Sequence, residues 1–284
     1  MAIADLKKIY ENDPSKKANL LLVKALVDNQ DYLAAKEYML EKINDYQDSE
    51  ANFKLMVKIF GLNHNFIQAQ IMIRSVKNGV FQSELQNDFN RLQREFINSH
   101  PDEINKMEMN LYHIGGAQLP IQQQIITESM NLPVPNYVDG AKGALSDPFL
   151  YPAIRFSLLD VLRELQFTQF IDINWLDKKV HRVNLFKLVP LSETMSAVGI
   201  FNVLERRFGQ TSPTIFQNMV KTFNLFLAYL YPFGDEIVTD YSLWVSVAYQ
   251  MQKGNHLDLN QLDDDAKAVY DWQFRLLKII ESIK

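Results

Sequence analysis

The chain has 284 residues and contains no cysteine. That absence excludes disulfide bonds, thiolate zinc sites, iron–sulfur clusters and cysteine nucleophiles. It also fits a reducing compartment, so we expect a cytoplasmic protein. Glycine and proline are scarce, with ten residues of each. Because these two residues interrupt helices, their scarcity favours a mainly helical chain.

Long apolar runs and basic segments are missing as well. The most apolar stretch, Met219–Tyr231, is interrupted by Lys221 and Asn224, so we expect no membrane span. Met1–Tyr10 alternates apolar and charged residues and lacks the apolar core of a signal peptide. The net charge is −5, and tight nucleic-acid binding needs many Lys and Arg contacts to phosphate, so no nucleic-acid partner is expected.

The patterns that mark catalysis are absent too. None of the five histidines has the spacing of paired metal ligands, and no phosphate-binding glycine loop or G-x-S-x-G turn occurs. His64 lies in a predicted turn and His100 precedes a proline, which is typical of solvated histidines. The sequence therefore predicts a protein that is not an enzyme and that holds no metal and no cofactor.

An internal repeat of 34 residues is the strongest feature present. Residues 18–43 align without a gap on residues 52–77, so that Leu21 matches Leu55 and Ala35 matches Ala69. Apolar residues recur at three- and four-residue spacing, which predicts two antiparallel helix hairpins after a leading helix. The predicted helices are Ala2–Glu11, Lys16–Asp28, Asp31–Tyr46, Ser49–Leu62 and Asn65–Lys77. A third hairpin is expected from Ser83–Ser99 and Pro101–Ile114.

The run Asp28–Ile43 resembles the centre of a tetratricopeptide repeat. That motif has a polar turn, then an aromatic residue and a small residue three positions later, as in Tyr32 and Ala35, and again in Phe66 and Ala69. The small residue lets the two helices approach closely. The match is degenerate, because bulkier residues occupy two further small positions of each copy. The resemblance implies an array of helices with a groove that binds protein or peptide.

The rest of the chain predicts a different organisation. Residues 115–148 read as a connector with one short helix, Ile121–Met130. Residues 149–284 read as a helical domain with one β-hairpin at about residues 170–188, where apolar and polar residues alternate. The predicted helices of this part are Asp147–Leu165, Ser192–Phe208, Pro213–Tyr231, Asp235–Gln252 and Asp263–Ile283. The fold class is therefore mainly α: a tetratricopeptide-like helix-hairpin array over residues 1–114, followed by a helical C-terminal domain with one small β-hairpin.

A second resemblance covers most of the chain. The β-hairpin, the run Ser212–Phe233 and the helix around Trp244 are similar to the C-terminal region of a family of uncharacterised tetratricopeptide-like proteins from low-GC Gram-positive bacteria. These motifs are packing motifs. The resemblance implies a cytoplasmic protein to which no reaction is assigned.

Four lysines are the candidate partner-binding residues. Lys17 and Lys24 are seven residues apart on one predicted helix, and Lys54 and Lys58 are four apart on the next, so each pair shares a face. In the family they resemble, these first helices line the groove, and arrays that bind acidic tails carry Lys, Arg and Asn there. Lys24 and Lys58 stand where asparagine is typical. The pattern indicates a groove for an acidic peptide or a C-terminal carboxylate, with a solvated lysine face as the alternative.

The sequence thus predicts a non-enzymatic scaffold or adaptor that binds a protein or peptide through its repeat groove. The alternative is a sensor of a small molecule or signal peptide, with a pocket in the C-terminal domain lined by Tyr241, Trp244 and Tyr249. Aromatic residues at helical spacing also fit an ordinary core. The oligomeric state is left open.

Overall fold

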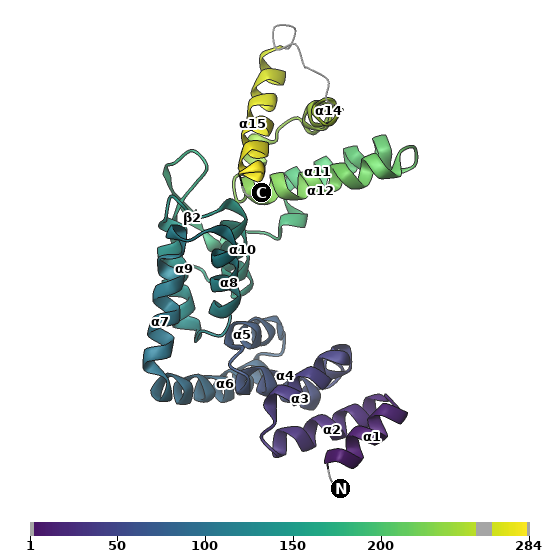
Figure 1. Ribbon diagram of the computed structural model, residues 1–284, viewed down its shortest axis with the longest axis vertical. Helices are drawn as coiled ribbons and strands as arrows, with labels where there is room; N and C mark the ends of the chain where they lie inside the picture. The colour runs from purple at the N-terminus through teal and green to yellow at the C-terminus, as the bar shows by residue number, and fades with distance from the viewer. Residues whose placement is uncertain (1–2, 254–262, 283–284) are drawn as a thin grey trace. The chain divides into compact units, whose positions relative to one another are not determined.

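The computed structural model describes residues 3–253 and 263–282. Over these residues it contains fifteen α-helices and one two-stranded antiparallel sheet, which confirms the prediction of a mainly α fold with one small β-hairpin (Figure 1). The predicted helix ends at Ala2 and Ile283 lie outside the described residues. None of the described helices is long and apolar enough to cross a membrane. The chain divides into two compact units, which are considered separately.

The first unit holds described residues 3–114, 123–143 and 164–166. Each of its first six helices packs on the next one along the chain. Its elements are α1 (Ile3–Asn12), α2 (Lys16–Asp28), α3 (Tyr32–Glu41), the 3-10 turn η1 (Ile43–Tyr46), α4 (Glu50–Leu62), α5 (Phe66–Ser75), α6 (Gly79–Ser99), α7 (Pro101–Tyr112), the second half of α8 (Leu119–Ser129) and most of α9 (Val134–Ser146).

Two helix hairpins, α2–α3 and α4–α5, have bounds that differ by 34 residues at every end. Their caps are offset in the same way, because the Ser15 and Ser49 hydroxyls each accept a hydrogen bond from the backbone N–H three residues later, both at 3.3 Å. Ala35 and Ala69 are fully buried at equivalent places, where a small side chain allows the helices of each hairpin to pack closely. Similar local sequence therefore builds similar local structure in both hairpins.

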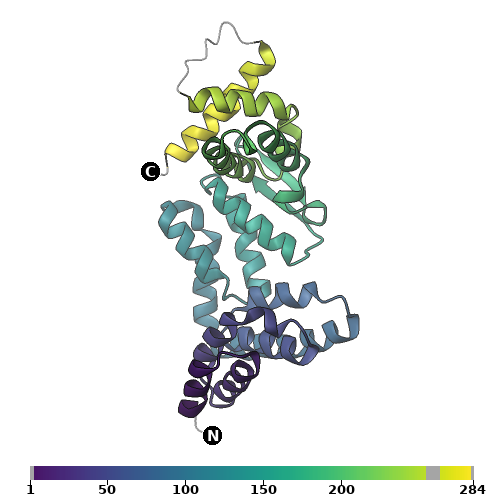
Figure 2. The same cartoon turned by 90° about the vertical axis from the view of Figure 1, so that its right-hand side faces the viewer.

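The expected third hairpin is not formed. α6 packs against α4 and α5 and buries Phe81, Leu85 and Phe89, so it covers the second hairpin. α7 then turns away from α6 (Figures 1 and 2). Only His100 separates the two helices, and a single residue is too short for the return that antiparallel helices need.

The prediction of a connector with one short helix over residues 115–148 is wrong, because α9 is a second helix in this segment. The Oε1 atom of Gln93 accepts a hydrogen bond from the backbone N–H of Val134 at 2.8 Å, and Pro135 is tolerated in the first turn. Gly140 lets α9 lie against α7, since a Cβ there would come within 3.2 Å of the Glu108 carbonyl oxygen. Gly143 likewise lies against Tyr112 of α7, so these two glycines of the segment serve helix packing.

The second unit holds residues 115–122, 144–163 and the described residues from 167 onward. Its α11 lies at the centre and packs against α12, α13 and α14. Besides the ends of α8 and α9, its elements are α10 (Pro152–Glu164), β1 (Phe170–Asn174), β2 (Val180–Asn184), the 3-10 turns η3 (Leu185–Lys187) and η4 (Leu191–Glu193), α11 (Met195–Leu204), the π-helical turn η5 (Glu205–Gly209), α12 (Pro213–Leu230), α13 (Gly234–Ile237), α14 (Tyr241–Gln252) and α15 (Asp264–Glu281). The 3-10 turn η2 (Ile114–Gly116) stands at the unit boundary.

The β-hairpin is present where alternation predicted it. β1 pairs with β2 in antiparallel register, with Ile171 opposite Val183 and Ile173 opposite His181. Ile171, Ile173 and Val183 are buried on one face. The buried face explains why a two-stranded sheet, which is marginal alone in water, is stable here.

The single helix predicted for Asp235–Gln252 is wrong, because α13 and α14 are separate helices. The break follows from Asp240, whose carboxylate accepts a hydrogen bond from the backbone N–H of Leu243 at 2.9 Å and so caps a new helix. α11 begins at Met195, later than the predicted start at Ser192, because the Thr194 hydroxyl caps it by accepting a hydrogen bond from the backbone N–H of Ala197.

Candidate functional site

The first pair of predicted lysines lies on α2. Lys17 and Lys24 border a surface hollow of about 440 Å³ that is lined only by α2 and its cap residue Ser15. Leu21 also lines this hollow and is 48% exposed. Both lysines are exposed, and neither has an ion-pair partner among the residues that the structure describes. The α2 surface therefore offers two ammonium groups beside an apolar side chain.

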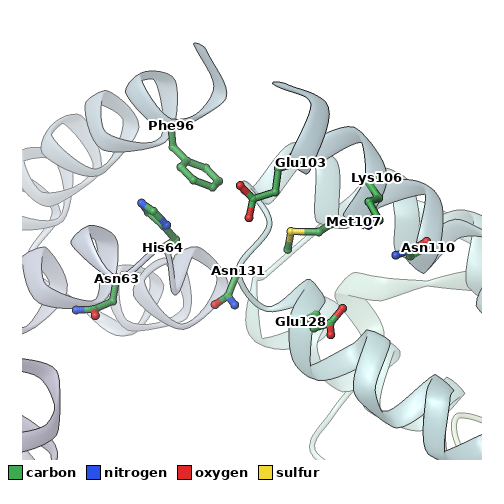
Figure 3. A pocket seen from close by; sticks show the side chains of 9 residues that line it. All are labelled: Asn63, His64, Phe96, Glu103, Lys106, Met107, Asn110, Glu128 and Asn131. Carbon is green, nitrogen blue, oxygen red and sulfur yellow. The ribbon is translucent and has the colours of Figure 1, made fainter. Parts of the chain in front are cut away.

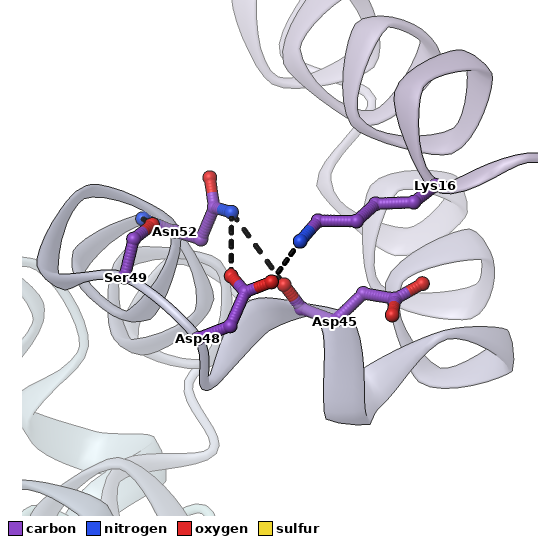
Figure 4. Close-up of polar contacts among 5 residues, drawn as sticks. All are labelled: Lys16, Asp45, Asp48, Ser49 and Asn52. Carbon is purple, nitrogen blue, oxygen red and sulfur yellow. Dashed lines mark hydrogen bonds and ion pairs between the residues drawn. The ribbon is translucent and has the colours of Figure 1, made fainter.

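Lys16, which follows the same cap, behaves differently. Its ammonium group pairs with the Asp48 carboxylate, and Asp48 also accepts a hydrogen bond from the Asn52 side-chain amide at 3.2 Å (Figure 4). Asp45 contributes its backbone carbonyl to the same amide. Lys16 is thus held by the loop between the two hairpins, which leaves Lys17 and Lys24 as the available charges of this helix.

The second pair lies on α4. Lys54 and Lys58 line another hollow, of about 170 Å³, formed with α6. The Lys54 ammonium group pairs with Glu84 and with Asp88, the latter at 3.1 Å. These hydrogen bonds, that to Glu84 first, raise the pKa of Lys54. Lys58 is exposed and has no ion-pair partner among the described residues.

The structure therefore brings the four lysines together in pairs, as their spacing predicted, but in two hollows with different linings. One lysine of the four is already neutralised by acidic residues of α6. These carboxylates are 30 or more positions away along the chain, so helical spacing gave no sign of them.

A stack of histidine and phenylalanine rings at the α4–α5 turn was not foreseen. The ring of His64 lies 4.1 Å from that of Phe96, and the ring of His100 lies 4.7 Å from it on another side. Burial, followed by the nearby His100, lowers the pKa of His64 below its ordinary value of 6.5. At neutral pH His64 is therefore uncharged.

The three aromatic residues proposed for a pocket in the C-terminal domain have separate packing roles. Tyr241 fills the space beside Gly199, and Trp244 is 1% exposed in the core. The ring of Tyr249 lies 5.0 Å from that of Phe208, tilted by 40°. No ring contact joins the three residues within the described part of the chain. They are explained by packing alone.

Comparison with known proteins adds no relative. The chain matches no protein family model, no curated protein and no solved structure. Across residues 3–253 and 263–282, no three His, Asp or Glu side chains gather closely enough to hold a metal ion. The candidate site therefore has to be interpreted from its own residues.

Proposed function

We propose that this protein is a non-enzymatic scaffold or adaptor that binds an acidic protein segment through the first helices of its tetratricopeptide-like hairpins. The observation that carries the proposal is that the ammonium groups of Lys17, Lys24 and Lys58 on α2 and α4 are exposed and form no ion pair with any described residue. Leu21 beside the first two adds apolar surface to the same face. The proposal takes the protein to be cytoplasmic, which its lack of cysteine fits.

Charge and apolar surface together define the partner. Exposed single ion pairs contribute only about 0.2–1 kcal/mol each, so the charges alone give weak binding. Burying the exposed side of a leucine adds apolar transfer free energy at about 25 cal/mol per Å². A segment that alternates acidic and apolar residues would gain binding free energy both from the ion pairs and from the burial of Leu21.

The test uses a fluorescent peptide of alternating glutamate and leucine residues, with its binding to the full chain followed by anisotropy. The variant is Lys17→Glu/Lys24→Glu, and the matched control is Lys8→Glu/Lys221→Glu, which reverses two exposed lysines elsewhere and changes the net charge equally. We expect the variant to bind about tenfold more weakly or worse, because each reversal turns an attraction into a repulsion. Binding by the wild type should also weaken as salt is added. Equal affinities for variant and control would show that this face does not bind the partner.

A further inference from the structure

A third hollow in the first unit, of about 370 Å³, is lined by polar side chains from three places in the sequence. Asn63 and His64 come from the α4–α5 turn, Glu103 and Lys106 from α7, and Glu128 from α8 (Figure 3). Phe96 of α6 forms part of its wall. This volume is that of a small ligand site and exceeds what a bare metal ion fills.

Glu128 is placed where a helix does not favour it. It lies in the last turn of α8, at the negative end of the helix dipole, where an acidic side chain costs stability. Its Oε1 atom accepts one hydrogen bond, from Gln124 one turn earlier at 2.8 Å, and no ion-pair partner for it occurs among the described residues. Gln124 and Glu128 thus form a side-chain pair within α8, and the exposed Glu128 side chain also lines the hollow (Figure 3).

Glu103 faces the same hollow from α7. Its position in the first turn suits the helix dipole, but its carboxylate has no hydrogen-bond or ion-pair partner in the part of the chain that the structure describes. Figure 3 shows this carboxylate directed towards the space beside Phe96 and His64. Two exposed carboxylates from different helices thus line one hollow.

The remaining walls complete a site for a positively charged group. Lys106 is the single full positive charge against two carboxylates, and His64 is uncharged at neutral pH, so the hollow is net negative. The rings of Phe96 and His64 supply a π surface, which attracts organic cations.

We propose that this hollow binds an alkyl guanidinium or alkyl ammonium group, with Glu103 and Glu128 as its counter-charges. The group belongs either to a free small cation or to an arginine or lysine side chain of a peptide. The site is independent of the lysine surface on α2, because its residues, its charge and its ligand are different.

The experiment titrates the full chain by calorimetry with three probes: agmatine, putrescine and a short arginine-containing peptide blocked at both ends. Saturable binding of agmatine or putrescine would identify a free cation as sufficient, and binding of the peptide alone would identify a basic side chain in a peptide. We expect Glu103→Gln and Glu128→Gln each to weaken the probe that binds by about tenfold, and the double variant to abolish its binding.

Asp102→Asn is the matched control, because Asp102 shares the first turn of α7 with Glu103 but does not line the hollow. It should bind like the wild type. Glu128→Gln removes an unfavourable charge from a helix end, so its melting temperature should not fall, and lost binding cannot then be attributed to unfolding. The proposal is overturned if none of the three probes binds saturably, or if the two glutamine variants bind as tightly as Asp102→Asn.

Discussion

Gln30 and His64 occupy equivalent positions in successive hairpins and share a left-handed backbone, with φ of 61° and 58°. Each follows the C-cap residue of a first helix, Asn29 or Asn63, and its backbone N–H donates to the carbonyl three residues earlier, at 3.0 Å and 3.1 Å. The next N–H, that of Asp31 or Asn65, reaches the carbonyl five residues earlier at 2.9 Å. This is the Schellman arrangement that ends many helices, and glycine is the residue that it favours.

Replacing Gln30 with glycine should therefore stabilise the protein. Gln30 is exposed, and glycine adopts a positive φ without the steric cost that a Cβ carries. We expect the free energy of unfolding to rise by about 0.5–1 kcal/mol, measured by urea denaturation. Gln217→Gly, at an exposed site inside α12, is the control and should lower stability by about 1 kcal/mol. A loss of stability in Gln30→Gly would show that its side chain matters more than its backbone.

The His64 stack should make the stability of the first unit depend on pH. The pKa of His64 is lower in the folded state than its ordinary value of 6.5, so the unfolded chain binds a proton more readily. The contribution of His64 is complete above about pH 6.5 and is lost as the pH falls through the folded-state pKa.

The melting temperature of the wild type should accordingly fall more between about pH 7.5 and about pH 5.5 than that of His64→Asn. Asparagine tolerates the left-handed backbone and has no titratable group. His113→Asn, which changes an exposed histidine outside the stack, serves as the control and should retain the wild-type pH dependence. The hypothesis is contradicted if the melting temperatures of His64→Asn and the wild type fall by the same amount over this pH range.

Arg155 in α10 is a buried cation with little compensation. It is 3% exposed, its Nε and Nη1 atoms have no hydrogen-bond partner among the residues that the structure describes, and burial lowers its pKa to about 10. One Nη2 contact, to the Leu150 carbonyl at 3.3 Å, remains. Because burying a charge without a partner is costly, Arg155→Met should raise the free energy of unfolding by about 1–4 kcal/mol.

Urea denaturation of Arg155→Met beside Arg206→Met provides the measurement. Arg206 is exposed, so its replacement should change stability by no more than about 0.5 kcal/mol. A clear loss of stability in Arg155→Met would mean that the guanidinium group has a partner in the folded protein.

Gly140 tests the packing of α9 on α7. An alanine Cβ would come within 2.9 Å of the Leu111 side chain and 3.2 Å of the Glu108 carbonyl oxygen, which belongs to the backbone and cannot turn aside. We expect Gly140→Ala to cost about 1–3 kcal/mol in thermal or urea unfolding. Gly116→Ala, where no atom lies within 4 Å of the added Cβ, should be nearly neutral, and an equally neutral Gly140→Ala would mean that α9 is less closely packed than described.

Local sequence predicted the two hairpins well. Ser15 and Ser49 mark helix starts by capping, and apolar spacing within each helix identifies the buried side, so the bounds of α2 are reproduced at both ends. The β-hairpin was equally visible, because the alternation of Ile171 and Ile173 with polar residues is itself the burial pattern. In these segments the residues that form the sequence pattern are the same residues that cap the helices or fill the buried face. Neighbouring positions are therefore enough for the prediction.

The wrong predictions concern segments whose structure depends on residues that are distant in the sequence. α9 begins with an N–H that Gln93 satisfies from 41 positions away, and its glycines are required by α7, so proline and glycine alone suggested a loop. The spacing of Gly140 and Gly143, three residues apart on one helix face, was the available signal of close helix packing. The ion pairs of Lys54 could not be predicted from local sequence either, because its partners Glu84 and Asp88 belong to another helix.

The ion pairs of Lys54 have a consequence for any acidic partner. Glu84 and Asp88 are tethered competitors, present at an effective concentration that can reach the millimolar range whatever the concentration of the partner. A segment that depends on Lys54 must displace them, whereas one that uses Lys17 and Lys24 meets no such competitor among the described residues. On the proposed function, Lys54 is therefore the least available of the four lysines, and an acidic segment already held by Lys17 and Lys24 displaces its two carboxylates more readily than one that arrives from solution.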